Sequence, residues 1–116
     1  MHNFEKLLFW QKSIVLAKNV YIICQEISND EKFGLISQIK RSAVSIPSNI
    51  AEGSGRNGSK EFNHFLAVAL GSAFELQTQL ILIKELNLLP EEKINALLSE
   101  VSEIQRMIYS FKNNLK

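Results

Sequence analysis

The chain has 116 residues, of which 46% are hydrophobic and 22% are charged, and its formal net charge is +1. This length is typical of one domain and can bury a core without disulfides or metals, so we expect a single domain over residues 1–116. The hydrophobic content excludes an intrinsically disordered chain. The net charge is far from that of a basic nucleic-acid-binding domain.

The N-terminal residues do not predict a targeting signal. Residues 1–3 lead directly into an amphipathic pattern, without the apolar stretch and cleavage site of a signal peptide. The longest apolar segment, Leu76 to Leu89, contains polar residues and is shorter than the roughly 18 apolar residues of a membrane span. We therefore expect a cytoplasmic protein with no membrane association.

Apolar residues recur at steps of three and four in four segments, which predicts four helices packed at shallow angles. No segment alternates with period two, and the connections are short, so we predict an all-α, antiparallel up-down four-helix bundle. The four stripes are Leu7, Trp10, Ile14, Ala17, Tyr21 and Cys24; Ile36, Ile39, Ala43, Ile46, Ile50 and Gly53; Phe62, Leu66, Ala69, Ala73, Leu76, Leu80 and Ile83; and Ile94, Leu97, Val101, Ile104, Ile108, Phe111 and Leu115.

Residues typical of helix ends separate these stripes. We expect Asn3 to cap the first helix and Ser59 to cap the third. Gly53 and Gly55 are expected to end the second helix in the left-handed conformation that glycine adopts at little cost. Pro90 fits the first turn of the fourth helix, because its fixed φ suits that position.

Two helices carry more apolar residues than an isolated bundle needs. One face of each helix is enough for such a core, so the surplus indicates a subunit interface. The alternative is a wide core seam with a few exposed apolar residues, which are normal on monomers. The surplus residues are Leu16, Val20, Ile23 and Ile27 in the first helix and Phe65, Val68, Leu70, Phe74 and Ile81 in the third.

Pro47 lies within the second stripe and allows two interpretations. Either one helix ends at Ile46 and another begins at Pro47, or a single helix continues through the proline with a kink. Isoleucine is among the poorest N-cap residues, and the stripe stays in register, so we predict a second helix kinked at Pro47. Ser45, Ser48 and Asn49 are placed to hydrogen-bond the backbone near it.

The segment "GSGRNGS", Gly53 to Ser59, resembles a phosphate-binding loop only superficially. It lacks the Walker order GxxxxGK[ST], and its literal GxGxxG match follows a predicted helix where a nucleotide site needs a strand. We interpret it as an interhelical turn. The N-terminus of the third helix, with Ser59, Lys60 and Arg56 nearby, remains able to attract an anion.

Positive charge is in local excess between Ser37 and Lys60, where four cations face one acidic residue, Glu52. Ordinary solvated surface charge explains it as well as a binding site does. The candidate nucleic-acid-binding residues are Lys40, Arg41, Arg56 and Lys60.

No pattern of reactive side chains predicts catalysis, a metal or a cofactor. Cys24 is the only cysteine and lies in an apolar stripe, which is typical of a structural thiol. Glu61 and His64 form one E-x-x-H, but a di-iron bundle needs two copies. A small-ligand site between helices would need polar groups in the core, and the stripes offer only Tyr21 and Trp10.

Four stretches that together cover nearly the whole chain match one family pattern. The most specific is "QIKRSAVSIPSNIAEGSGR". The others are "LLFWQKSIVLAKNVY", "EFNHFLAVALGSAFELQTQL" and the Leu-Pro-Glu before the last helix. On these stretches the chain resembles the bacterial four-helix-bundle proteins encoded in intervening sequences of 23S rRNA genes, often labelled S23 ribosomal proteins. This family includes the accessory variability determinant of diversity-generating retroelements.

The resemblance implies an up-down bundle and a homopentamer with a central channel. It also implies nucleic-acid binding beside a reverse transcriptase for the retroelement branch, whose proteins are strongly basic, unlike this chain. Two functional hypotheses follow. The first is a non-enzymatic oligomeric scaffold that binds RNA or single-stranded nucleic acid through the basic residues. The second is a protein–protein interaction module that binds no nucleic acid.

Overall fold

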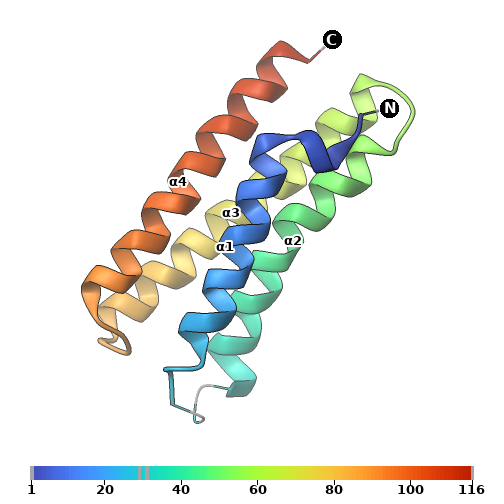
Figure 1. The fold of residues 1–116 in the computed structure, drawn as a ribbon. Coiled ribbons are helices and arrows are strands. Elements are labelled where there is room, and N and C mark those ends of the chain that lie inside the picture. The colour runs from blue at the N-terminus through green and yellow to red at the C-terminus, as the bar shows by residue number, and fades with distance from the viewer. Residues whose placement is uncertain (1, 29, 31, 116) are drawn as a thin grey trace.

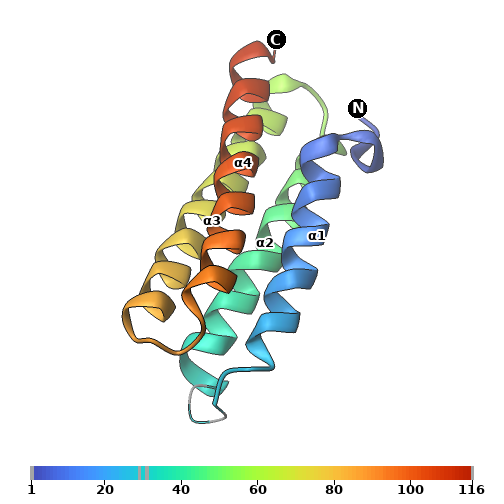
Figure 2. The ribbon, with the colours of Figure 1, turned by 60° about the vertical axis from the view of Figure 1, so that its left-hand side comes forward.

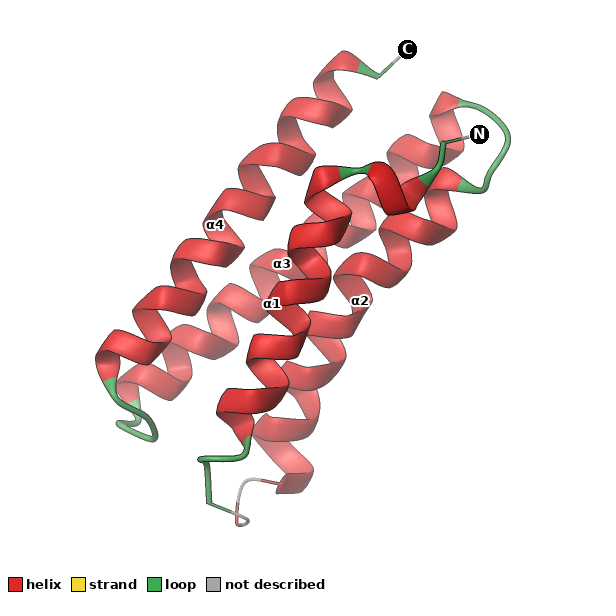
Figure 3. Cartoon of the chain, viewed as in Figure 1, coloured by secondary structure: helices red, strands yellow, loops and turns green. Residues whose placement is uncertain are grey.

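A computed structural model describes residues 2–28, 30 and 32–115, and four α-helices account for most of them (Figure 1). The helices are α1 (Leu8–Cys24), α2 (Ser37–Ser54), α3 (Ser59–Glu85) and α4 (Glu91–Asn114). A 3-10 turn, η1 (Phe4–Lys6), precedes α1, and a π-helical turn, η3 (Lys32–Ile36), leads into α2. The described residues form only helices and connections, without a strand, which confirms the all-α prediction (Figure 3).

The four helices are arranged as an antiparallel up-down bundle that measures 44 × 23 × 19 Å. Each helix packs on its neighbours in the chain, and α1 also packs on α4, which closes the bundle (Figure 2). Both termini lie at the end that carries the α2–α3 turn, and the other two connections lie at the opposite end (Figure 1). The predicted architecture is therefore confirmed.

The stripes predicted for α2, α3 and α4 all contribute to the core. Every residue of the second and third stripes is buried, as are the first five residues of the fourth. Phe111 and Leu115, at the end of the fourth stripe, are partly buried and pack against the core. The 3-4 spacing brings these residues to one side of each helix, and that side faces the bundle axis.

For α1, the predicted stripe is largely wrong. Ile14 and Tyr21 are 43% and 45% exposed, and the buried line instead contains Phe9, Ser13, Leu16, Val20 and Ile23. Leu16, Val20 and Ile23 of this line are among the residues predicted to exceed the needs of the bundle core. Ser13 interrupts the line in a hydrophobicity scan, but its hydroxyl donates to the Trp10 carbonyl at 2.7 Å, so it is buried without a lost hydrogen bond.

Helix α2 continues through Pro47, which confirms that one helix spans the stripe. The amide of Asn49 donates to the carbonyl of Ser45 at 2.8 Å and to its hydroxyl at 3.0 Å. Ser45 in turn shares a 2.8 Å hydroxyl contact with Ser72 of α3. Side chains on both sides of the proline therefore form hydrogen bonds with the backbone of α2 and with α3. The kink at Pro47 remains a prediction.

The helix ends differ from the expected ones in detail. Gly53 lies inside α2 and is buried. A Cβ at this position would come within 2.6 Å of the Phe65 Cβ, so a larger residue does not fit. Gly55 does end α2 as its C-cap, but its conformation is right-handed, with φ −87°, and Gly58, with φ +93°, is the N-cap of α3. The expectation that Gly53 and Gly55 adopt the left-handed conformation is therefore wrong. Glycine is instead required at position 53 because α2 and α3 approach each other closely there.

Two further cap predictions shift by a few residues. Asn3 does accept a hydrogen bond, from the Glu5 amide at 3.2 Å, but it caps η1 rather than α1. Ser59 is the first residue of α3, so it follows the cap. Pro90 is the N-cap of α4 rather than part of its first turn, which contains the acidic Glu91 and Glu92. Acidic residues there interact favourably with the positive end of the helix dipole.

Candidate interaction surfaces

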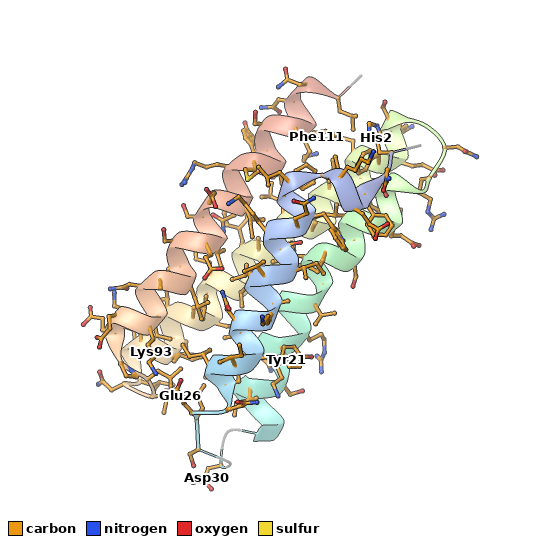
Figure 4. All side chains as sticks on the ribbon, viewed as in Figure 1. His2, Tyr21, Glu26, Asp30, Lys93 and Phe111 are labelled. Atoms are coloured by element: carbon orange, nitrogen blue, oxygen red, sulfur yellow. The ribbon has the colours of Figure 1, made fainter. Side chains whose placement is uncertain are left out.

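The four candidate nucleic-acid-binding cations lie at the two ends of α2. Lys40 is in the first turn of this helix, and its Nζ lies 4.9 Å from the centre of the Tyr21 ring on α1. Arg41 follows it and is exposed. Figure 4 labels Tyr21 in the half of α1 far from the termini. This pair of cations is therefore close to the connection between α1 and α2.

Arg56 and Lys60 lie at the other end of α2. Arg56 donates to the Glu52 carboxylate at 2.8 Å and stacks over the Phe65 ring at 5.0 Å, so its charge is partly neutralised. Lys60 is exposed in the first turn of α3. Because a helix rises 1.5 Å per residue, the two pairs of cations are separated by on the order of 20 Å. The chain thus presents two small basic sites rather than one patch.

A small hollow of about 80 Å³ lies at the N-terminus of α3, where the sequence suggested anion binding. It is lined by His2, Arg56, Gly58, Ser59 and Phe62. The His2 amide donates to the Ser54 carbonyl at 3.0 Å, and the His2 ring lies 4.9 Å from Phe62 and 5.9 Å from Phe111 (Figure 4). The N-terminal segment therefore packs over the α2–α3 turn and forms one wall of the hollow.

The exposed side of α3 is mostly apolar. Glu75 is the only charged residue between Glu61 and Lys84, a stretch of about six helical turns. We call the exposed, mostly apolar side of this stretch the α3 outer face. Its members are His64, Ala67, Val68, Gly71, Phe74, Glu75, Thr78, Ile81 and Leu82. Val68, Phe74 and Ile81 of the predicted surplus are thus exposed, whereas Phe65 and Leu70 are partly buried.

A second apolar surface runs between α1 and α2. We call it the α1–α2 groove; its volume is about 290 Å³. The residues that sequence periodicity assigned to the α1 core stripe, Trp10, Ile14 and Ala17, form one wall of this groove. The sequence indicates two apolar lines on α1. The periodicity argument assigned the groove line to the core and the buried line to the surface. The full lining is Phe4, Trp10, Ile14, Ala17, Val44, Pro47, Ser48 and Ala51.

The bundle interior contains few polar groups. Among the described residues, the buried polar ones are Ser13, Ser42 and Ser54. The hydroxyls of Ser13 and Ser54 each donate to a carbonyl of their own helix. The Ser42 hydroxyl shares its single proton between the Glu75 carboxylate at 2.8 Å and the Gln38 carbonyl at 3.1 Å. Tyr21 is exposed and Trp10 lines the groove, so neither residue contributes to a polar cluster in the core.

Residues with reactive side chains lie apart. Among the described residues, no three His, Cys, Asp or Glu side chains gather as a metal site would require. Glu61 and His64 are both exposed. Cys24 is buried, and burial raises the pKa of its thiol above the ordinary value of 9.0, with a smaller opposing effect of the Lys40 charge. A raised pKa disfavours the reactive thiolate.

Helix α3 is long and apolar enough to cross a membrane by length and composition, with a mean hydropathy of 1.6 over 18 residues. Core helices of soluble proteins can pass the same test. Here the inner side of α3 forms part of the bundle core, yet only 39% of this window is buried. Core packing within the bundle therefore accounts for only part of the apolar character of α3.

The fold defines a four-helix-bundle protein with apolar surfaces on α3 and between α1 and α2. Residues 5–110 match the 23S rRNA-intervening sequence proteins, and the chain belongs to this family. It is also similar to a crystal structure of a protein with unknown function from the S23 ribosomal protein family of Bacteroides thetaiotaomicron. That similarity has a TM-score of 0.86 at 25% identity and covers 92% of this chain and 96% of the other. No curated protein matches the chain.

Proposed function

We propose that this protein is a non-enzymatic scaffold that assembles through contacts between its own copies. The observation that carries the proposal is the α3 outer face. A helix that is apolar on all sides is normally buried on all sides, whereas α3 exposes Phe74 by 52% and Leu82 by 45%. Contiguous exposed apolar surface of this kind marks interaction sites on soluble proteins.

Family resemblance supports a homopentamer as the size of the assembly. Cyclic assemblies close when each subunit contacts its neighbours through the same rotation. The apolar surfaces described above fit such an assembly, because a subunit in a ring has two neighbours and needs surface for both.

Light scattering on the purified full-length chain at micromolar concentration tests this proposal. We expect a mass about five times that of the subunit, which is 13.2 kDa. A single species at the subunit mass would refute self-association. An oligomer of another size would keep the scaffold and reject the pentamer.

We propose RNA or single-stranded nucleic acid as a second ligand of the assembly, held by Lys40, Arg41, Arg56 and Lys60. Arg41 and Lys60 are exposed and form no ion pair or hydrogen bond with other described residues, so both charges are available for phosphate contacts. Repetition of these small basic sites around a ring would multiply contacts that are weak in one subunit. A reverse transcriptase is the protein partner that the retroelement relatives suggest.

Filter binding with labelled RNA and single-stranded DNA tests the nucleic-acid proposal. Because the binding would depend on phosphate contacts, we expect retention at about 50 mM salt that falls steeply by about 200 mM. Arg41→Ala with Lys60→Ala should weaken retention, and Lys18→Ala, an exposed cation on α1, is the matched control. No retention at low salt would instead favour a protein–protein interaction module.

A further inference from the structure

We propose that neighbouring copies bind head to tail, so that the α3 outer face of one subunit occupies the α1–α2 groove of the next. This inference rests on the proposed self-association and specifies its interface. The two surfaces differ in shape and lie on different elements. One is the exposed side of a single helix that carries Phe74, and the other is a groove between two helices.

A symmetric dimer would leave one of these surfaces uncovered. In a two-fold dimer each subunit uses the same patch, so contact through α3 alone would leave the groove exposed to water. A heterologous contact buries one surface of each kind at every interface, and repetition of it around a ring covers both surfaces on every subunit. The presence of two unlike apolar surfaces therefore favours the head-to-tail arrangement.

Contacts within the subunit fix the heights of the two surfaces along the bundle. The Ser42–Glu75 hydrogen bond and the Ser45–Ser72 contact align the first half of α2 with the middle of α3. The Lys40–Tyr21 contact places the same end of α2 beside the second half of α1. Lys40 and Glu75 therefore lie within about one helical turn, 5.4 Å, of the same height.

Copies related by a rotation about an axis parallel to the helices keep these heights. The proposal then places Phe74 of one subunit level with Ala17 and Val44 in the groove of its neighbour. It also places the Glu75 carboxylate of the first subunit level with the Lys40 ammonium of the second.

Charge complementarity selects this groove among the apolar surfaces. Glu75 is the only charge on the α3 outer face, and Lys40 forms no ion pair with other described residues, so each can pair with the other across the interface. Two other hollows border α1, both on its α4 side. One contains Glu26 and Glu100 together with Lys93, which already pairs with Glu26 at 2.7 Å, so Glu100 there has no cation partner among the described residues and would repel Glu75. The other, of about 600 Å³, contains Arg106 but lies between the start of α1 and the end of α4, nearer the termini than Glu75 in the middle of α3.

Gly71 is consistent with close contact at the α3 outer face. It lies in the interior of α3, where glycine is unfavourable, and a Cβ at this position would have no neighbour within 4 Å inside the subunit. Packing within the subunit therefore gives no reason for glycine here. A neighbouring subunit that approaches the α3 backbone would supply one.

A charge-reversal pair tests the proposed contact. Lys40→Glu and Glu75→Lys should each raise the dissociation constant of the assembly by about tenfold or more, because like charges would then face each other. The double variant Lys40→Glu/Glu75→Lys should recover most of the loss. Glu75→Gln removes the charge but retains an acceptor for Ser42, so it separates the charge effect from loss of the internal hydrogen bond. The matched control is Lys12→Glu/Glu103→Lys, which reverses an ion pair within the subunit.

A mixing experiment tests the head-to-tail arrangement itself. Phe74→Asp removes the apolar projection, and Ile14→Asp places a charge in the groove, so each variant alone should be monomeric. Mixed together, they should form a dimer of twice the subunit mass, since one intact interface remains. Circular dichroism confirms that both variants are folded.

The outcomes separate the two proposals. A monomeric wild-type chain refutes self-association. A wild-type oligomer that is unaffected by the Lys40 and Glu75 variants, or folded variants that stay monomeric when mixed, overturns the head-to-tail interface and leaves self-association standing. Recovery by the double reversal together with dimer formation on mixing supports the interface. Lys40 would then act between subunits, and Arg41, Arg56 and Lys60 would remain for nucleic acid.

Discussion

The outer faces of α3 and α4 are chemically opposite although both helices have one side in the same core. Exposed positions of α4 include Glu91, Glu92, Lys93, Glu103 and Arg106, so this helix is amphipathic in the ordinary way. The outer face of α3 has one charge in about six turns. Because both helices contribute buried residues to the bundle core, we attribute the difference to the proposed self-association, in which the α3 outer face meets another copy.

The largest expected effects concern the inner faces, where α3 and α4 should behave alike. Leu76→Ala and Ile104→Ala each remove a side chain that is at most 1% exposed. We expect each to lower the free energy of unfolding by about 2–5 kcal/mol, from lost burial and the remaining cavity. Urea denaturation at one fixed protein concentration measures both. A loss below about 1 kcal/mol for either variant would contradict the equivalence of the inner faces.

The comparison is tested most directly by a matched pair of outer-face variants. Phe74→Asp on α3 and Tyr109→Asp on α4 replace aromatic residues that are 52% and 55% exposed. We expect Phe74→Asp to dissociate the assembly to the 13.2 kDa subunit, because complete burial of such a side chain contributes about 1.5–3 kcal/mol at each interface. Tyr109→Asp should leave the mass unchanged. Light scattering decides, and equal effects of the two variants would break the contrast.

Gly71→Ala should have opposite effects on the subunit and on the assembly. Alanine favours helix over glycine by about 0.8–1.0 kcal/mol, and nothing in the subunit obstructs a Cβ there. We expect a higher melting temperature in the monomeric Phe74→Asp background, together with weaker association in the wild-type background. Ser99→Ala, at an exposed α4 position, is the control and should change association in neither direction. Unchanged association with Gly71→Ala would argue against close approach at α3.

The smallest expected effect concerns the ion pairs between α4 and its neighbours. Lys12 and Glu103 are 3.1 Å apart, but both side chains are substantially exposed to solvent. A double-mutant cycle with Lys12→Ala and Glu103→Ala should give a coupling of about 0.2–1 kcal/mol that decreases with added salt. A larger, salt-insensitive coupling would show that α4 is also covered in the assembly.

The sequence was sufficient for the fold because the stripes of α2, α3 and α4 are long and regular. It was insufficient for α1, which has two apolar lines of the same spacing. The buried line contains Ser13, whose hydroxyl binds its own helix, and a hydrophobicity scan penalises that polar residue. Similarly, Gly53 looked like a helix terminator, whereas packing against Phe65 requires the absence of its Cβ within the helix.

The candidate site was only partly predictable from the sequence. The four cations were identified from the charge distribution along the sequence, and because they lie within one segment they suggested a single patch. The length of α2 separates them into two pairs, and Glu52 partly neutralises Arg56. The surplus apolar residues of α3 were recognised from their spacing. The groove that we propose as their partner surface requires two helices side by side, and that juxtaposition is not encoded in any one segment.

The sequence by itself determined the number of helices, their order and the inner faces of three of them, because a 3.6-residue period is a local property of the chain. Only the tertiary structure decided which side of α1 is buried, how α2 passes close to α3 at Gly53, and where Lys40 and Glu75 lie relative to each other. Those features depend on contacts between residues distant in the chain, and spacing within one helix carries no information about them.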